Sequence, residues 1–133
     1  MKNYTTELSF VLKVSTIPDA GIGVFALHDI ASGVWLEVIP RGYQARKFKG
    51  NELPDELRAY CIAKGNNIYT CPRHFNRMDI GWYMNHSATP NADWDDALDG
   101  YVSTQPISTG EEILINYNLF EEPAQKKQDY YET

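Results

Sequence analysis

The sequence contains little cysteine: Cys61 and Cys71 are the only two among 133 residues. Small exported domains that depend on disulfides carry many more, so this count favours two reduced, buried thiols. A Cys-x-x-His spacing joins Cys71 to His74, with Cys61 and His28 as the other candidate zinc ligands. Structural zinc sites usually combine two such close pairs, and one stands here alone. We therefore predict no metal site.

Long apolar runs are also missing. The longest unbroken run covers residues 59–63, whereas a membrane-spanning helix needs about 20 apolar residues. Residues 1–7 contain no apolar segment of the kind that a signal peptide carries. These absences predict a soluble protein that is neither exported nor inserted in a membrane. We expect it in the cytoplasm, and residence in a nucleus, including that of a host cell, stays open.

Positive charge is scarce, because 12 lysines and arginines stand against 18 aspartates and glutamates, a net charge of −6. Since a nucleic-acid surface needs clustered cations, we predict no direct binding of nucleic acid. A negative field attracts lysine-rich or arginine-rich peptides, so a basic protein or peptide is the predicted partner, although a solvated acidic face has the same composition. The acidic residues cluster late in the chain, at Asp93, Asp95, Asp96, Asp99, Glu111, Glu112, Glu121 and Glu122.

The remaining composition, 43% hydrophobic and 13% aromatic, is typical of a folded protein with enough rings for aromatic pockets. A chain of 133 residues fits one core, so we predict a single domain over 1–133. Residues 121–133 are polar and acidic, which fits either a frayed tail or a flap that closes over a site. No pattern indicates the oligomeric state.

Alternating apolar residues predict mainly β structure. Residues 8–14 show the period of two of a half-buried strand. Other short apolar runs end at glycine, proline or serine turns, and they predict strands at 24–27, 34–39, 67–71, 101–104 and 113–117. Residues 54–61 begin with proline and two acids and carry apolar residues on one face, as a helix does. We therefore predict many short strands and one short helix.

Three segments contain residues suited to chemistry. Gly21 and Gly23 stand at the start of a predicted strand, where a missing Cβ lets the backbone approach a ligand or adopt a positive φ. Asn85 and His86 lie where an apolar run passes into a turn, and such groups need hydrogen-bond partners when buried. Tyr117 ends the last predicted strand. Taken singly, each has a plain structural interpretation: a glycine turn, a satisfied core pair, and a strand tyrosine with its hydroxyl at the rim.

Taken together and in this order, the three segments resemble the signature of SET-domain lysine methyltransferases. They read AGIGVFA at 20–26, YMNHSATPN at 83–91 and GEEILINY at 110–117. The resemblance implies a mainly β, β-clip-like SET fold of small curved sheets, one or two short helices and a threaded C-terminal segment. It also implies a protein-lysine N-methyltransferase that uses S-adenosyl-L-methionine (SAM) on a basic protein or peptide such as a histone. No cysteine follows Tyr117, so the chain is similar to compact members without zinc modules.

The resemblance further implies roles for individual residues. Tyr117 matches the family's catalytic tyrosine, whose phenolic oxygen would hold the substrate amine in line with the methyl group. The residues that would contact SAM are Ala20, Gly21, Ile22, Gly23, Asn85 and His86. The residues that would line the lysine channel are Tyr60, Tyr69, Trp94, Leu119 and Phe120.

One departure from the family pattern keeps a rival function open. Many members carry Tyr-x-Gly at the end of the strand predicted here at 34–39, and Tyr43 is close but out of register. If that hydroxyl helps to orient the amine, the chain could be a module that keeps the scaffold and binds basic peptides without modifying them. A third reading, an unrelated small β-barrel, predicts that the Asn-His pair and Tyr117 lie apart in space.

Overall fold

A computed structural model describes residues 1–63 and 65–117. Its strands are β1 (Phe10–Val14), β2 (Ile22–Ala26), β3 (Arg46–Lys49), β4 (Ile62–Ala63), β5 (Ile68–Cys71), β6 (Asn85–His86), β7 (Ala92–Asp95), β8 (Gly100–Ser103) and β9 (Glu112–Ile115). The single α-helix of these ranges, α1, is Asp55–Arg58, and the 3₁₀ helices are Gly50–Glu52, Phe75–Arg77 and Ile80–Tyr83.

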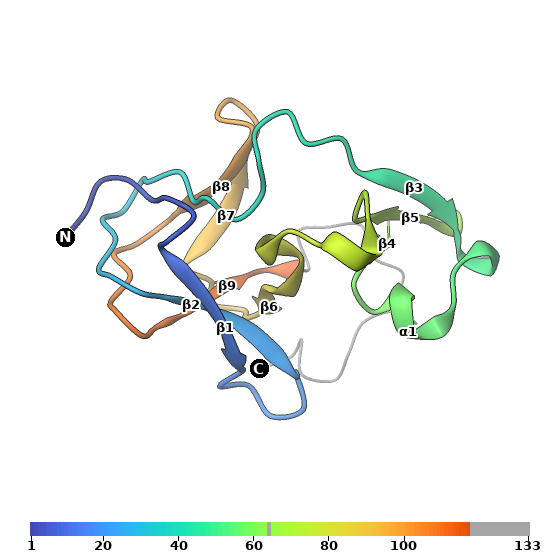
Figure 1. Cartoon of the computed structure of the whole chain (residues 1–133), viewed down its shortest axis with the longest axis horizontal. Coiled ribbons are helices and arrows are strands. Elements are labelled where there is room, and N and C mark those ends of the chain that lie inside the picture. Colours follow the sequence, from blue (N-terminus) through green and yellow to red (C-terminus); the bar gives the residue numbers. More distant parts are fainter. Residues whose placement is uncertain (64, 118–133) are drawn as a thin grey trace.

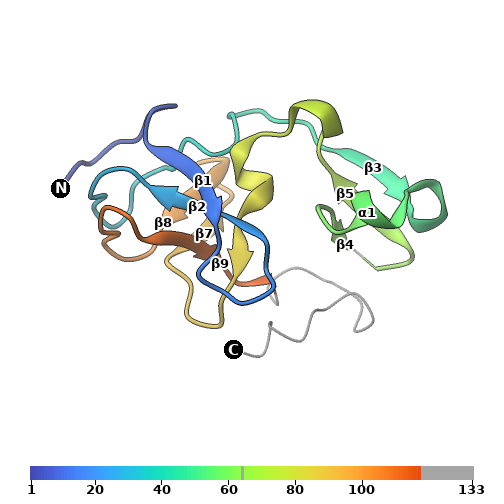
Figure 2. The ribbon, with the colours of Figure 1, turned by 60° about the horizontal axis from the view of Figure 1, so that its bottom comes forward.

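The described strands form three small sheets, in the orders β1-β2-β9-β6, β3-β5-β4 and β7-β8. All neighbours are antiparallel except β6, which runs parallel to β9. Figures 1 and 2 both show the β3-β5-β4 sheet and α1 at one end of the molecule, away from the other two sheets. The predicted fold class, mainly β with small sheets and few helices, is confirmed. The threading of the C-terminal segment and the tail at 121–133 concern residues beyond the described ranges.

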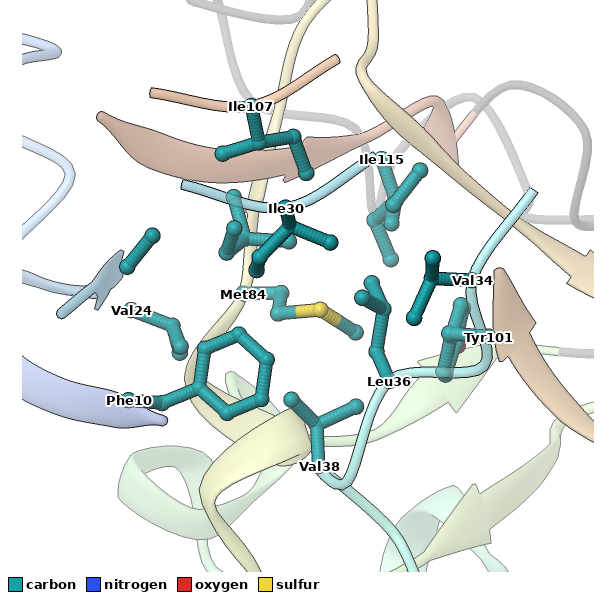
Figure 3. Close-up of a cluster of buried hydrophobic side chains, with 13 residues drawn as sticks. Phe10, Val24, Ile30, Val34, Leu36, Val38, Met84, Tyr101, Ile107 and Ile115 are labelled. Carbon is teal, nitrogen blue, oxygen red and sulfur yellow. The ribbon is translucent and has the colours of Figure 1, made fainter. Parts of the chain in front are cut away.

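The main core fills the space between the β1-β2-β9-β6 and β7-β8 sheets. Figure 3 shows the sulfur of Met84 near the middle of this cluster, with Phe10 from β1 and Tyr101 from β8 among the side chains around it. A smaller cluster lies under the β3-β5-β4 sheet, where Cys61 and Cys71 are both buried, as predicted. Fully burying a large apolar side chain contributes about 1.5–3 kcal/mol, so these clusters are what hold such short strands together.

Residues 34–39 do not form the predicted strand. Leu36 and Val38 are buried, so the alternation correctly identified inward-facing side chains. However, Trp35 makes only an isolated bridge to Val102, and the N–H of Val38 donates to the carbonyl of Leu36 two residues earlier. Alternation reports burial, whereas a strand also needs a continuous backbone partner. Residues 33–36 bond to the backbone of β8 around this one bridge, but residues 37–39 turn away from it, so the pairing is too short to form a strand.

The helix predicted at 54–61 is also shorter than expected. Only Asp55–Arg58 is helical, because the N–H of Tyr60 turns back to the carbonyl of Leu57 and Ile62 already pairs with β5. A single turn is too short to be stable alone, so α1 depends on the sheet beside it. No helix in the described ranges has the length and apolar character needed to span a bilayer.

Asp29 ties the loop after β2 to the turn before β9. Its Oδ1 accepts hydrogen bonds from the backbone N–H of Thr109 at 2.7 Å and from the Thr109 hydroxyl at 2.8 Å. The backbone hydrogen bond, and then the hydroxyl bond, lowers the pKa of this carboxyl below its ordinary 3.8. A depressed pKa means that the native state favours the carboxylate, so the stabilisation is present above about pH 4 and is lost as pH falls through the folded pKa.

We therefore expect Asp29→Asn to flatten the acid limb of the stability curve. Urea denaturation at a series of pH values between about 5 and 2 should show wild type losing stability more steeply than the variant. Glu56→Gln, which changes an exposed carboxylate of α1, is the matched control and should follow wild type. Identical acid limbs for Asp29→Asn and wild type would contradict the assignment.

Candidate active site

Strand β9 brings the three sequence segments together. Residues 20–23, which we call the glycine bend, lead into β2, and β2 pairs with one edge of β9 through Val24↔Ile113. β6 pairs with the other edge through Asn85↔Leu114. Tyr117 lies two residues beyond the end of β9. The reading of an unrelated barrel, in which these residues lie apart, is wrong, since one strand holds them side by side.

A buried carboxylate, Glu112, connects two of these segments. It is 4% exposed and accepts hydrogen bonds from the Ser15 hydroxyl, from the Thr16 backbone N–H at 2.9 Å and hydroxyl at 2.6 Å, and from Asn85 Nδ2 at 3.0 Å. The sequence reading placed Glu112 with the acidic residues that attract a partner, and this was wrong. Glu111, just before β9, is exposed. Alternation along β9 places Glu112 on the face opposite the core residues Ile113 and Ile115. There Ser15, Thr16 and Asn85 cover it.

The glycine bend is held against this carboxylate. Asn85 Nδ2 donates to the Ile22 carbonyl at 3.0 Å as well as to Glu112. A Cβ on Gly23 would stand 2.2 Å from Glu112 Oε2, so this position has no room for a side chain. Gly21 differs: its φ is +75°, and a Cβ there would meet no atom within 4 Å. Gly23 is needed for space and Gly21 for conformation, and the backbone before Gly23 faces an open region.

His86 is fully buried beside Tyr117. Its Nδ1 accepts the backbone N–H of Tyr117 at 3.0 Å, and the two rings lie 5.5 Å apart between centroids. Because Nδ1 is the acceptor, the neutral ring carries its proton on Nε2. The imidazole thus fixes where the chain leaves β9 and, with it, the direction of the tyrosine.

Tyr117 lies against a small cavity. Its hydroxyl donates a short hydrogen bond to the carbonyl of Met84, the residue just before Asn85. The cavity measures about 60 Å³ and is lined by Ile39, Ala59, Tyr60, Cys61, Ile62, Gly81, Trp82, Met84, Tyr101, Ile115 and Tyr117. On the same measure one water molecule needs about 10–15 Å³, so the cavity has room for a few waters or for the end of one slender side chain.

The aromatic residues predicted to line a lysine channel lie in different places. Tyr60 lines the cavity, where its ring packs edge-on against Tyr83 at 5.7 Å. Trp94 is 39% exposed and packs behind the cavity residue Tyr101 at 5.2 Å. Tyr69 belongs to the smaller cluster under β5. Trp94 and Tyr69 do not line the cavity, so their contact with a lysine substrate stays a prediction. Leu119 and Phe120 lie outside the described residues.

Two cavity aromatics were missed from the sequence. Trp82 directly precedes the Asn-His segment, and Tyr101 opens the apolar part of β8. Burial, and secondarily the charge of Asp93, raises the pKa of Tyr101 well above that of a free phenol. Its hydroxyl therefore stays protonated at physiological pH. Adjacency to a motif could have identified Trp82, but nothing local indicates that Tyr101 faces the same space.

A second hollow adjoins the cavity, and Ile39 lines both. It measures about 340 Å³ and combines an apolar floor with three carboxylates; it is lined by Glu7, Phe10, Glu37, Val38, Ile39, Pro40, Asp79 and Ile80. Partial burial raises the pKa of the Asp79 carboxyl above its ordinary value. Within residues 1–63 and 65–117, no three His, Cys, Asp or Glu side chains gather so as to hold a metal ion.

The fold and this site define a small mainly β protein in which a glycine bend, a buried Asn-His pair and a cavity tyrosine meet on one strand. The sequence profile of the SET domain matches residues 21–118. The chain therefore belongs to the SET-domain family, as the resemblance implied. No curated protein sequence matches it at a significant level.

Solved structures show the same fold. A candidate histone methyltransferase of Plasmodium falciparum is 23% identical, with a TM-score of 0.52 over 83% of this chain and 93% of its own. Two Polycomb Repressive Complex 2 structures of Chaetomium thermophilum have TM-scores of 0.54, at 19% identity for a humanized mutant bound to the inhibitor GSK126 and 18% for an autoinhibited conformation bound to SAM. They cover 81% and 82% of this chain, which spans only 14% and 15% of theirs.

Proposed function

We propose that this chain is a SAM-dependent protein-lysine N-methyltransferase that acts on a basic protein or peptide such as a histone. Membership of the SET-domain family supports methyl transfer, and one similar complex is bound to SAM. The observation that carries the proposal is that Met84 and Asn85, which are adjacent in sequence, contact the two sides of the site. The Met84 carbonyl accepts the Tyr117 hydroxyl, and the Asn85 side chain holds the glycine bend. Two neighbouring residues thus join the proposed lysine side to the proposed cofactor side.

The cofactor would bind along the backbone of residues 20–23 with Asn85 and His86. The residues fit such a group because the space over Gly21 is open and the Ile22 side chain is 49% exposed, while Asn85 holds the Ile22 carbonyl in place. When bound, SAM supplies a methyl group on a positively charged sulfonium. The chain's contribution is a bend that needs no rearrangement to receive a ligand.

The cavity would accept the lysine amine. An ammonium group, whose ordinary pKa is about 10.4, has no lone pair for attack, and an apolar wall disfavours the charged form. The Tyr117 proton is directed at the Met84 carbonyl, so the phenolic oxygen keeps lone pairs that accept an N–H of the amine. Holding the nitrogen in one position makes the displacement effectively unimolecular. Positioning and exclusion of water therefore carry the catalysis, and no protein nucleophile is needed.

A basic substrate suits the surroundings of the cavity. The adjoining hollow carries the carboxylates of Glu7, Glu37 and Asp79 over an apolar floor. A lysine-rich or arginine-rich peptide offers both the charge and the aliphatic stems that such a surface pairs with.

One observation favours the rival, a module that binds basic peptides without modifying them. The Tyr43 hydroxyl accepts the backbone N–H of Arg73 at 2.6 Å, so it supplies no hydroxyl to the cavity. Three tyrosines line the cavity, Tyr60, Tyr101 and Tyr117, and of these Tyr117 is bonded to the Met84 carbonyl. If a hydroxyl from the position of Tyr43 is required to orient the amine, binding would survive and transfer would not.

Calorimetry with SAM and a radiolabelled-methyl assay together test the proposal. We expect SAM to bind and label to appear on core histones or on a lysine-rich peptide, and to be lost when every lysine of that peptide is changed to arginine. Peptide binding without label, in the presence of bound SAM, would support the rival. Absence of SAM binding would contradict the methyltransferase proposal, whereas the rival needs only binding of the peptide.

A further inference from the structure

The net charge of −6 is an average over one region rich in lysine and arginine and another rich in carboxylates. Residues 41–77 contain eight of the twelve lysines and arginines and only three carboxylates, whereas residues 78–117 contain seven carboxylates and no lysine or arginine. The first region includes the whole β3-β5-β4 sheet, which both views show at one end of the molecule. The cations are therefore separated from the acidic part in space as well as in sequence.

Five exposed cations of this end form what we call the basic surface. They are Arg46, Lys47, Lys49, Arg73 and Arg77. Three of them lie on β3, an edge strand of its sheet, where Lys47 and Lys49 point to one face and Arg46 to the other. Arg73 lies two residues after Cys71, the β5 partner of Arg46. Strand pairing thus concentrates positive charge from two distant parts of the chain.

Two guanidinium groups of the basic surface have fixed positions. Arg46 Nη1 donates to the Arg73 carbonyl at 3.4 Å, and Arg73 Nη1 donates to the Gln44 carbonyl at 3.3 Å. The Arg46 guanidinium also lies 4.5 Å over the ring of Phe48. Each guanidinium has five N–H donors, so these contacts orient the groups and leave most donors for a ligand.

No salt bridge among the described residues neutralises the basic surface, and the Glu52 carboxylate beside it accepts the backbone N–H of Lys49 at 2.7 Å. The one salt bridge found within residues 1–63 and 65–117 joins Arg58 to Asp55 on α1. Like charges held close together repel each other, and a bound anion would relieve that repulsion. These cations, without a salt bridge in the part of the chain that the structure describes, therefore need an explanation beyond solubility.

A polyanion that binds the basic surface is either an acidic protein or a nucleic acid. The exposed apolar side chains near the surface distinguish between these two classes. A protein partner normally inserts large apolar or aromatic side chains at the centre of its interface, whereas phosphate contacts need only cations. Among the described residues 41–77, Tyr60 is the only large apolar side chain that is markedly exposed, and it belongs to the cavity. The basic surface thus offers charge without an apolar centre.

We propose that the basic surface binds the phosphate backbone of double-stranded nucleic acid. Lys47 and Lys49 point to the same face of β3 and lie about 7 Å apart along it, at a strand rise of about 3.3 Å per residue. A duplex carries one charge for about every 1.7 Å of its axis, so several phosphates lie within reach. The binding is independent of base sequence, and it does not depend on the proposed methyl transfer. The sequence-based prediction of no nucleic-acid binding used the net charge, which averages over both ends.

Fluorescence anisotropy with a labelled mixed-sequence DNA duplex of about 20 base pairs tests this inference on the full chain. At about 50 mM salt we expect a Kd in the micromolar range that weakens steeply toward 200 mM, because bound cations release counterions. Lys47→Gln/Lys49→Gln should weaken binding about tenfold and reduce the slope of log K against log salt by about 1.8, which is about 0.9 for each lost phosphate contact.

Lys2→Gln/Lys13→Gln is the matched control, because it also removes two lysines but lies outside residues 41–77. It should keep the wild-type Kd within about twofold, and thermal melts should show both variants folded. Equal weakening in both double variants, or no wild-type binding at about 50 mM salt, would overturn the proposal. Tighter binding of a glutamate-rich peptide than of the duplex would overturn it in favour of an acidic protein partner.

Discussion

Tyr117→Phe should lower kcat about 100-fold or more while SAM affinity stays close to that of wild type. The change removes one oxygen atom, which donates to the Met84 carbonyl and faces the cavity. Without it, the amine loses the group that holds it in line, and misplacement of a reacting atom by about 1 Å costs about 100-fold. The hydrogen bond itself is worth only about 0.5–1.5 kcal/mol of stability, so the variant should fold. Single-turnover transfer of labelled methyl is the measurement.

Tyr83→Phe provides the control for this experiment. Tyr83 lies in the same stretch of chain, and its hydroxyl contacts only the sulfur of Met78, at 3.9 Å, among the described residues. It should keep wild-type kcat within about twofold, since that contact is too weak to fix a position. Equal rates for Tyr117→Phe and wild type would remove Tyr117 from the chemistry.

Glu112→Gln should destabilise the protein by about 2–3 kcal/mol, although it changes one atom. The carboxylate accepts two donors that cannot become acceptors, the Thr16 N–H and Asn85 Nδ2. A glutamine has one oxygen and one NH₂ group, so in either orientation its NH₂ faces one of these donors. Leaving a buried group without a partner costs about 1–3 kcal/mol, and the neighbouring hydroxyls must also rearrange. Urea denaturation at neutral pH measures the loss.

The same variant should weaken SAM binding, because Asn85 holds the glycine bend and also contacts Glu112. Glu111→Gln is the control: its side chain is exposed, and its Oε1 accepts the Ser108 N–H at 2.9 Å, which a glutamine oxygen also does. Its other contact, from Asn91 Nδ2 to Oε2, is long at 3.4 Å. It should lose less than about 0.5 kcal/mol, as surface substitutions usually do. A Glu112→Gln protein as stable as Glu111→Gln would mean that the buried contacts are not what holds the bend.

Sequence patterns located the strands whose apolar faces point at the core. β1, β2, β5, β8 and β9 lie within two residues of their predicted ranges. β3 and β7 were missed because arginine, lysine and aspartate fill their outward positions and hide the alternation. β6 was missed because it has only two residues. Local patterns report which side chains are buried, and they cannot report which distant backbone will supply the hydrogen bonds.

The site also consists of residues that the sequence predicted and of contacts that only the structure shows. The glycine bend, the Asn-His pair and Tyr117 were identified as candidates because their order resembles one family, whose profile matches residues 21–118. Their direct contacts, with Asn85 on the Ile22 carbonyl and His86 on the Tyr117 N–H, appear only in the folded chain. The burial of Glu112 was missed, because two adjacent glutamates look alike until a strand assigns one of them to a covered face.

The sequence by itself determined the family, the mainly β class and the residues proposed for chemistry, since motif order and apolar spacing are properties of the chain. Only the tertiary structure decided which face Glu112 takes, which aromatics surround the cavity, and that the lysine-rich and arginine-rich stretch lies at one end of the molecule. Those outcomes depend on strand pairing between residues far apart in sequence, as when β9 joins β2 to β6. The free energy of such a pairing comes from contacts that exist only after the chain has closed on itself.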